Sequence, residues 1–587
     1  MNVQHLMFKM SSKASSFLIA VTFLANLITV ILTETNEVEI QTRLGNIIGL
    51  QQVTNKGTVY QFLNVPYGKP PIGHLRFQKP QPFGAWSQTL NATILGPMCY
   101  QSRQQTSKYP GISEDCLKLN IYVPNRVVSS NNKPVMVWIH GGGFLYGSGG
   151  DYDGSALSLN GDVIVVTMNY RLGIFGFLQS KNFKAKGNTG LWDQILALNW
   201  VRYNIKDYGG NPKDVTLFGE SSGGMSVSLQ SLIPSNKGLF HRVIAQSGVA
   251  NSFLALPNTA AQHTIEIAEM VGCSHARSTN EQIFIECLQC VDAANLVNAT
   301  DYLFVGNELK FMADLPFAPV IDGELFHKNP AILLKDRTSS EFTFFQSLDL
   351  MVGTCDNDGS EALGLSSSFQ SQLNVDFSKG LPTQVFCESI ITEFSKTLYN
   401  NNRDVSAAIC EKYSVTNDNE EQARMFLNMY GDAGFVAPAT LVLKQHSNSL
   451  QGSTTYQFVF SEELPFLNPD APSWYKGSAH ASDIYFMFYY EDMKKESNFS
   501  KETDVLVDQM RSYWTNFART GNPNGPNLAD WRSFDDNTDH PFMNLQVSNI
   551  SLGTNYRKEY TDFWNQKLPY IFQHRCDENS CALPIVG

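Results

Sequence analysis

The sequence contains little of what binding to nucleic acid or lasting residence in a membrane requires. Lys and Arg number 43 against 55 Asp and Glu, a net charge of −12, and no segment gathers the basic residues into a patch. A nucleic-acid partner is therefore not expected, because phosphate binding needs clustered positive charge. After residue 35 no apolar run is long enough to span a bilayer, and the last residues form neither a hydrophobic tail nor an endoplasmic-reticulum retention tetrapeptide. We expect no stable membrane anchor in the mature chain.

Linkers, internal repeats and low-complexity segments are also missing from the 587 residues. The length alone would allow about four domains, but nothing in the sequence divides the chain into them. No group of Cys and His residues has the spacing of a zinc site. We predict a single domain over residues 36–587 that needs no metal or organic cofactor. Its oligomeric state stays open.

The first 35 residues differ from the rest of the chain. Lys9 and Lys13 precede an apolar run from Phe17 to Leu32. A positive segment followed by an apolar run too short to span a bilayer comfortably is typical of a cleaved signal peptide. An uncleaved signal anchor is the alternative, and no small-x-small site fixes the cleavage position. We predict that residues 1–35 are a signal peptide and that the mature protein is secreted.

The cysteines and the glycosylation sequons agree with secretion. All ten cysteines lie in the mature chain, an even number that suits an oxidising compartment. Three pairs are close enough in sequence to close short loops: Cys99 with Cys116, Cys273 with Cys287, and Cys576 with Cys581. Four Asn-x-Ser/Thr sequons predict N-glycosylation, at Asn91, Asn298, Asn498 and Asn549.

Apolar runs that alternate with helical patterns indicate the fold class. Five runs are predicted as buried strands: residues 134–140, 163–170, 214–218, 348–353 and 455–460. Residues 191–201 and 225–230 are predicted as helices. Near-continuous β-branched runs separated by helices predict an α/β protein, with a large, mostly parallel sheet covered by helices on both faces. Such sheets bind ligands at the carboxyl ends of their strands.

The most informative motif follows the strand at residues 214–218. It reads Gly219-Glu220-Ser221-Ser222-Gly223-Gly224 and leads at once into a predicted helix. A strand that turns directly into a helix crowds its side chains, and glycine on both sides of Ser221 relieves the crowding. The turn would expose the Ser221 hydroxyl as a nucleophile. This pattern should occur by accident in about one chain in five of this length. Other residues must therefore decide whether Ser221 is a nucleophile.

A glycine run after another predicted strand supplies hydrogen-bond donors. It reads His140-Gly141-Gly142-Gly143-Phe144. Residues without side chains allow the backbone to approach a ligand and aim its amides at it. With the N–H of Ser222, the amides of Gly142 and Gly143 can form a three-donor oxyanion hole for acyl transfer.

A serine nucleophile also needs a base and an acid. His480 stands in a late segment that turns helical, in agreement with the chain order Ser, acid, His. Asp356, Asp358 and Glu361 follow a predicted strand and compete for the acid, and spacing alone does not choose among them.

Longer motifs reveal a family resemblance from about Val38 to Trp531. They stand at residues 62–67 (FLNVPY), 70–77 (PPIGHLRF), 113–120 (SEDCLKLN), 169–173 (NYRLG), 187–194 (GNTGLWDQ) and 514–523 (WTNFARTGNP). With the serine motif, they make the chain resemble the type-B carboxylesterases, the carboxylesterase/cholinesterase family of the α/β-hydrolase fold. The resemblance implies a serine hydrolase that cleaves carboxylic esters of small molecules through an acyl-enzyme.

The resemblance also assigns residues. Asp358 takes the place of the family's catalytic glutamate, although its side chain is one methylene shorter. Arg76–Glu114 and Arg171–Asp193 should be buried ion pairs, and Ser247 should lie behind the histidine of the triad. Cys99–Cys116 and Cys273–Cys287 match family disulfides. Four cysteines stay unassigned: Cys290, Cys355, Cys387 and Cys410.

Two alternatives to a general carboxylesterase remain. Cholinesterases bind a quaternary ammonium group through a tryptophan in the loop between their first two cysteines, but the corresponding loop here, residues 100–115, contains no tryptophan. Non-catalytic adhesion proteins of the family often lack triad residues, whereas all three positions are competent here. The resemblance therefore favours a carboxylesterase.

Overall fold

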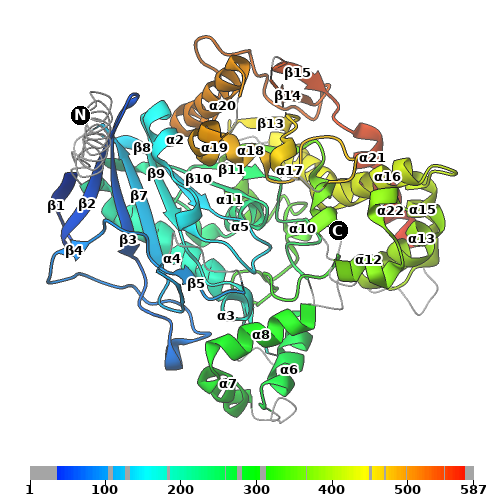
Figure 1. The fold of residues 1–587 in the computed structure, drawn as a ribbon, viewed down its shortest axis with the longest axis horizontal. Helices are drawn as coiled ribbons and strands as arrows, with labels where there is room; N and C mark the ends of the chain where they lie inside the picture. The colour runs from blue at the N-terminus through cyan, green and yellow to red at the C-terminus, as the bar shows by residue number, and fades with distance from the viewer. Residues whose placement is uncertain are drawn as a thin grey trace, which may run out of the picture.

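The computed structural model describes residues 36–102, 110–125, 132–180, 185–257, 259–273, 281–304, 312–364, 367–448, 452–467, 471–496, 499–547 and 549–574. A 13-stranded sheet runs through the molecule and carries helices on both sides (Figure 1). Along its main path the strand order is β1-β2-β3-β7-β9-β8-β10-β11-β12-β13-β14-β15, and β4 pairs with β2. The predicted signal peptide lies outside the described residues.

The middle of the sheet is parallel, as predicted. The parallel strands are β8 (Lys133–Ile139), β9 (Ile164–Met168), β10 (Gly210–Glu220), β11 (Arg242–Gln246), β12 (Asp349–Cys355), β13 (Thr455–Phe460) and β14 (Pro541–Leu545). All five predicted strands are present. The sequence analysis missed β11 and β14, each only five residues long; β11 begins and ends with polar residues, and β14 begins with a proline.

Both edges of the sheet are antiparallel, and they extend it beyond the predicted part. One edge contains β1 (Asn36–Thr42), β2 (Gly45–Thr54), β3 (Gly57–Pro66) and β7 (Lys118–Pro124), and the other ends in β15 (Ser551–Thr554). The remaining short strands are β4 (Leu90–Asn91), β5 (Met98–Cys99) and β6 (Ile112–Ser113).

Alternate residues of β8 point to two hydrophobic cores, one on each face of the sheet. Val135, Val137 and Ile139 belong to the core that contains α4 (Thr189–Asn204) and α5 (Ser222–Gln230). Met136 and Trp138 belong to the core that contains α2 (Ser155–Gly161) and α20 (Lys501–Thr520). A strand buried on both faces requires this continuous apolar sequence. The prediction of helices on both faces is confirmed.

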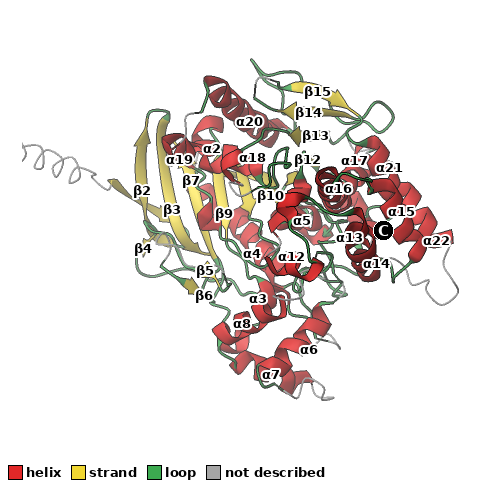
Figure 2. Cartoon of the chain, turned by 45° about the vertical axis from the view of Figure 1, so that its right-hand side comes forward, coloured by secondary structure: helices red, strands yellow, loops and turns green. Residues whose placement is uncertain are grey.

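Further helices lie beyond the sheet (Figure 2). One lobe contains α6 (Ala260–Met270), α7 (Glu281–Cys290) and α8 (Ala293–Phe304) beside α3 (Gly173–Phe177). The other α-helices are α10 (Pro330–Leu333), α11 (Ser340–Phe345), α12 (Ser367–Leu373), α13 (Thr383–Val385), α14 (Ile391–Leu398), α15 (Arg403–Tyr413), α16 (Asn419–Gly431), α17 (Ala437–Ser447), α18 (Ser482–Ile484), α19 (Tyr490–Glu496), α21 (Lys558–Asp562) and α22 (Leu568–His574).

Disulfides join segments within the outer parts of the fold. Cys99–Cys116 and Cys273–Cys287 are present as expected, and a third disulfide joins Cys387 to Cys410. The sequence analysis assigns neither of these two cysteines to a disulfide. Among the described residues, Cys290 is a free exposed thiol and Cys355 a free buried one. Cys576 and Cys581 lie outside the described residues.

Two ion pairs, of which Arg171–Asp193 is buried and Arg76–Glu114 is partly buried, fix loops near the carboxyl ends of the strands. Nη2 of Arg76 lies 2.6 Å from Oε2 of Glu114. The Arg171 guanidinium donates to both carboxylate oxygens of Asp193 at 2.8 Å. Both pairs are present, as the family resemblance implies.

Some predictions concern the surface of the chain. Asn91, Asn298 and Asn549 are exposed, and Asn498 lies outside the described residues. Glycosylation stays a prediction. In the part of the chain that is described, no helix is both long enough and apolar enough to cross a membrane.

Candidate active site

Ser221 lies at a sharp turn between β10 and α5. Its backbone has φ +56° and ψ −126°, and its amide donates to the carbonyl of Gln246 on β11 at 2.9 Å. The turn is packed tightly against the end of β8. A Cβ added at Gly219 or Gly223 would lie 2.6 or 2.1 Å from the carbonyl oxygen of Ile139, closer than real atoms approach. The two glycines are therefore required for this close approach, as the sequence motif indicates.

His480 and Asp358 meet beside this turn. Nδ1 of the His480 ring lies 2.8 Å from Oδ1 of Asp358, and both side chains are buried. The backbone brings the two segments together: the amide of Asn357 donates to the carbonyl of Ser478, and the His480 amide donates to Oγ of Ser360 at 2.7 Å. The pairing of a late histidine with an acid after β12 agrees with the predicted order.

The other oxygen of Asp358 is also held. The Cys355 amide lies 3.1 Å from Oδ2 of Asp358 and 3.3 Å from Oγ of Ser247, so it donates to both. Ser247, buried and at φ +46°, thus lies beside the carboxylate that contacts the histidine. Both oxygens of the Asp358 carboxylate are therefore in hydrogen bonds, which fix its position beside the His480 ring.

The two competing acids make different contacts. Asp356 accepts from the Ser478 amide at 2.6 Å, and burial raises its pKa to about 6. Glu361 is exposed and lines a cavity that also borders His480. Of the three acids that the sequence left open, only Asp358 makes a hydrogen bond to the His480 ring in the described part of the chain.

The second ring nitrogen of His480 faces the serine turn. Nε2 lies 3.2 Å from Oε1 of Glu220, the residue immediately before Ser221. Burial opposes protonation of His480, but the carboxylates of Glu220 and Asp358 outweigh it and raise the histidine pKa above its ordinary value. For Glu220, burial has the opposite sign: it disfavours the carboxylate and so raises the pKa of this residue. The sequence analysis gave Glu220 no role, although this residue stands directly before Ser221 in the motif.

The candidate oxyanion hole follows β8. Gly142 and Gly143 have φ values of +106° and +60°, and the amides of Leu145 and Tyr146 both donate to the Gly142 carbonyl. This turn leaves the glycine amides at the carboxyl end of the sheet. Ser222 is the first residue of α5, so its amide is one of the N–H groups that lack an acceptor within the helix. The three predicted donors thus come from the loop after β8 and from the first residue of α5, which begins directly after Ser221.

Two further side chains near His480 carried no sequence signal. The Phe435 ring packs on the His480 ring with centroids 4.9 Å apart. Asp483 is buried, accepts from Gln246 at 2.7 Å, and has a pKa that burial raises to about 6. Both contacts join segments far apart in the chain, which a sequence pattern does not report.

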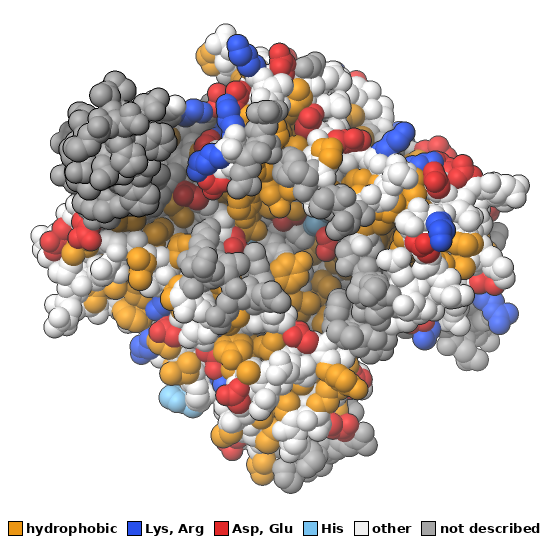
Figure 3. Space-filling model, in the orientation of Figure 1, with side chains coloured by type: hydrophobic (Ala, Val, Ile, Leu, Met, Phe, Trp, Pro, Cys, Tyr) orange, Lys and Arg blue, Asp and Glu red, His pale blue; other side chains and the backbone are white. Residues whose placement is uncertain are grey.

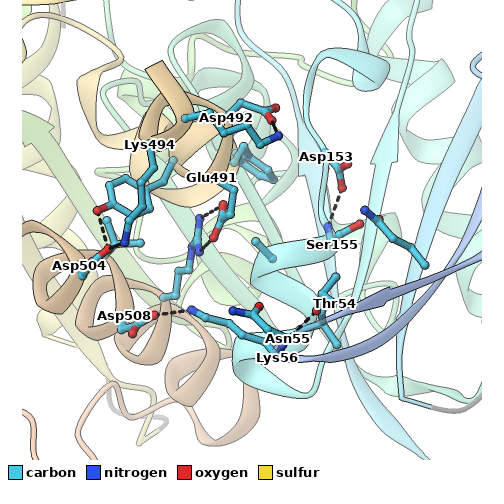
Figure 4. Close-up of a pocket in the computed structure, with 18 residues that line it drawn as sticks. Thr54, Asn55, Lys56, Asp153, Ser155, Glu491, Asp492, Lys494, Asp504 and Asp508 are labelled. Carbon is cyan, nitrogen blue, oxygen red and sulfur yellow. Dashed lines mark hydrogen bonds and ion pairs between the residues drawn. The ribbon is translucent and has the colours of Figure 1, made fainter. Parts of the chain in front are cut away.

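Another cavity, of about 590 Å³, lies between the β2–β3 turn and helices α19 and α20 (Figure 4). Its charged side chains pair with one another: Lys56 lies 3.0 Å from Asp508, and Arg511 forms two bonds to Glu491. No histidine is among the described residues that line it. Nor do the described residues anywhere bring together three His, Cys, Asp or Glu side chains in a way that could hold a metal ion.

The family match and the similar proteins agree with one another. Residues 36–564 match the carboxylesterase family. The chain is 33% identical over 542 residues to a liver carboxylesterase of Sus scrofa, covering 89% of this chain and 91% of that protein. It is 35% identical over 519 residues to liver carboxylesterase 1 of Oryctolagus cuniculus, covering 84% and 86%. Carboxylesterase 5A of Mus musculus is 33% identical over 556 residues, covering 92% and 90%.

Proposed function

Because the chain belongs to the carboxylesterase family and hydrolyses carboxylic esters, we propose that Ser221, His480 and Asp358 are its catalytic triad. The observation that carries this proposal is the buried hydrogen bond between His480 and Asp358, with the other ring nitrogen facing the residue before Ser221. A histidine held in this way has one nitrogen fixed as a donor and the other available to a hydroxyl.

The chemistry proceeds in two halves. Oγ of Ser221 attacks the ester carbonyl and forms a bond to its carbon, while Nε2 of His480 takes the hydroxyl proton. The carbon–oxygen bond to the alcohol then breaks, and His480 gives the proton to the departing oxygen. A water activated by His480 cleaves the acyl-enzyme and restores Ser221. Asp358 orients the ring and stabilises its cation.

The amides of Gly142, Gly143 and Ser222 hold the negative oxygen of each tetrahedral intermediate. The positive φ of both glycines and the position of Ser222 at the start of α5 support this role. Loss of one such donor typically costs about 3 kcal/mol of transition-state stabilisation. The buried side chain of Gln101 supports the loop, since it exchanges two bonds of 2.9 Å with the backbone of Gly147.

The site belongs to a protein that we propose to be secreted. The signal peptide at residues 1–35, a single domain over 36–587 and glycosylation at Asn91, Asn298, Asn498 and Asn549 are parts of this proposal. Three disulfides among the described residues support an oxidising compartment. Expression in cultured cells, with the mature N-terminus sequenced from the medium, tests the leader, and mobility before and after N-glycosidase tests the sequons.

Labelling with diisopropyl fluorophosphate tests the triad. We expect modification of Ser221 in the native protein and none in Ser221→Ala. Turnover of short acyl esters, long acyl esters and thiocholine esters by both proteins then defines the preferred acyl and alcohol groups. An adhesion protein without an active site would show neither labelling nor turnover. That result would overturn the triad assignment.

A further inference from the structure

A cavity of about 680 Å³ borders His480. Its described walls come from η6 (Asp358–Gly364), which begins at the proposed triad acid, from Gln370 of α12, from residues 376–378, and from residues 467, 471–472 and 479–485 around His480. Figure 3 shows a hollow near the centre of one face, with acidic and histidine side chains among hydrophobic ones. Because Glu361 on its wall is exposed, the cavity beside His480 opens to solvent.

This cavity lies on the side of the site where the alcohol portion of an ester must be. In the proposed mechanism, the oxyanion hole holds the carbonyl oxygen and His480 hands its proton to the oxygen of the alcohol. The group attached to that oxygen consequently extends toward His480. Nε2 of the ring is buried and lies 3.2 Å from Oε1 of Glu220, the residue before Ser221, so this nitrogen faces the serine turn at which that oxygen would stand.

Apart from the His480 ring, the charged side chains that line the cavity are acidic. Glu361 and Asp376 line it, and the described lining residues include no Lys or Arg. Asp376 forms an ion pair with Lys379, which lies 3.0 Å away and is not among the residues that line the cavity. Glu361 is thus the principal negative charge at the wall. The rings of Phe377 and Tyr485 form part of the same surface and add apolar area.

We propose that this cavity binds the alcohol portion of the ester and that Glu361 selects alcohols carrying an alkylammonium group. The inference rests on the proposed function and names the substrate class of the same site. A carboxylate at the edge of a partly desolvated cavity attracts a cation more strongly than it would in bulk water. The net charge of −12 adds a long-range attraction for cationic substrates. The cation would be held by a carboxylate, without a tryptophan.

A matched pair of thioesters tests the inference. Butyrylthiocholine and S-(3,3-dimethylbutyl) thiobutyrate have the same shape and acyl group, and they differ by a quaternary nitrogen in place of a carbon. We expect the kcat/KM of the cationic ester to exceed that of the neutral one by about tenfold at low ionic strength. The ratio should fall toward two in Glu361→Gln, invert in Glu361→Lys, and decrease in 0.5 M salt.

Glu502→Gln is the matched control, because Glu502 is an exposed acid in the first turn of α20 and does not line the cavity. Its ratio should equal that of the native protein, and turnover of the neutral ester shows that each variant is folded. A native ratio near one, or a high ratio that Glu361→Gln leaves unchanged, overturns the inference while ester hydrolysis stands. Failure to cleave either ester, together with no labelling of Ser221, overturns the proposed function and this inference with it.

Discussion

Asp358 reaches the ring of His480 at 2.8 Å although its side chain is one methylene shorter than the glutamate of the resembling family. Backbone contacts compensate for the missing length. Asn357 and Ala479 form a parallel bridge, and the His480 amide bonds to Ser360, so the acid and the base lie on segments that are tied together on both sides.

The first prediction concerns this acid. Asp358→Asn keeps the size of the side chain but removes the charge that fixes the ring and stabilises its cation. We expect kcat for a nitrophenyl ester to fall by about 10³ to 10⁴, with the thermal midpoint little changed. Asp356→Asn is the neighbouring control and should lose less than about tenfold, because Asp356 bonds the Ser478 amide instead of the ring. Equal losses in both variants would contradict the assignment.

The second prediction concerns the pH dependence of activity. The Glu220 carboxylate raises the pKa of His480, and the neutral ring is the base, so activity rises with pH as His480 loses its proton. Glu220→Gln removes this charge and lowers the histidine pKa. The acidic limb of the kcat/KM profile should therefore move to lower pH, by about 1 unit or more. A limb that stays where it is in the native protein would show that Glu220 does not influence the base.

Much of the fold and of the site follows from local sequence. Strand β8 is predictable because its residues are apolar on both faces, and the Ser221 turn because glycine must stand at Gly219 and Gly223, where the chain meets Ile139. Both signals are contained within about ten residues. Spacing in the sequence did not identify the proposed triad acid. The choice of Asp358 came from the family resemblance.

The remaining parts depend on contacts between distant segments. Strand β2 is mostly polar on its exposed face and therefore lacks a continuous apolar run. The Phe435–His480 contact joins a helical turn to the turn before α18, and the sequence separates the two by other elements. The contact between Glu220 and His480 becomes visible only when β10 and the late histidine segment are placed together.

The third prediction concerns the unpredicted disulfide. Cys387–Cys410 closes a loop across 23 residues between η8 (Phe386–Ile390) and α15. In the chain-entropy model, such a cross-link stabilises the fold by about 3 kcal/mol. The double variant Cys387→Ser, Cys410→Ser should therefore unfold at a lower temperature in calorimetry. Cys290→Ser, which removes an exposed free thiol, is the control and should leave the transition unchanged.

The last prediction concerns a buried network behind the histidine. Asp432 begins η9 (Asp432–Val436), the π-helical turn that carries Phe435 onto His480. Its carboxylate accepts from the Arg557 guanidinium at 2.7 Å and from the Tyr413 hydroxyl at 2.9 Å. Arg557, near the C-terminal end of the described chain, thus helps to hold the turn that packs against the His480 ring.

Arg557→Met would leave the Asp432 charge buried without its cation, a defect that typically costs about 3 to 5 kcal/mol. The turn is the element that can relax, so we expect kcat to fall more than KM changes, together with a lower thermal midpoint. Arg557→Lys keeps the charge and should restore part of both. Arg532→Met, which removes an exposed ion pair to Asp539, is the matched control and should change neither. A variant with a lower midpoint but a native kcat at a temperature where it is folded would show that the network stabilises the chain without positioning His480.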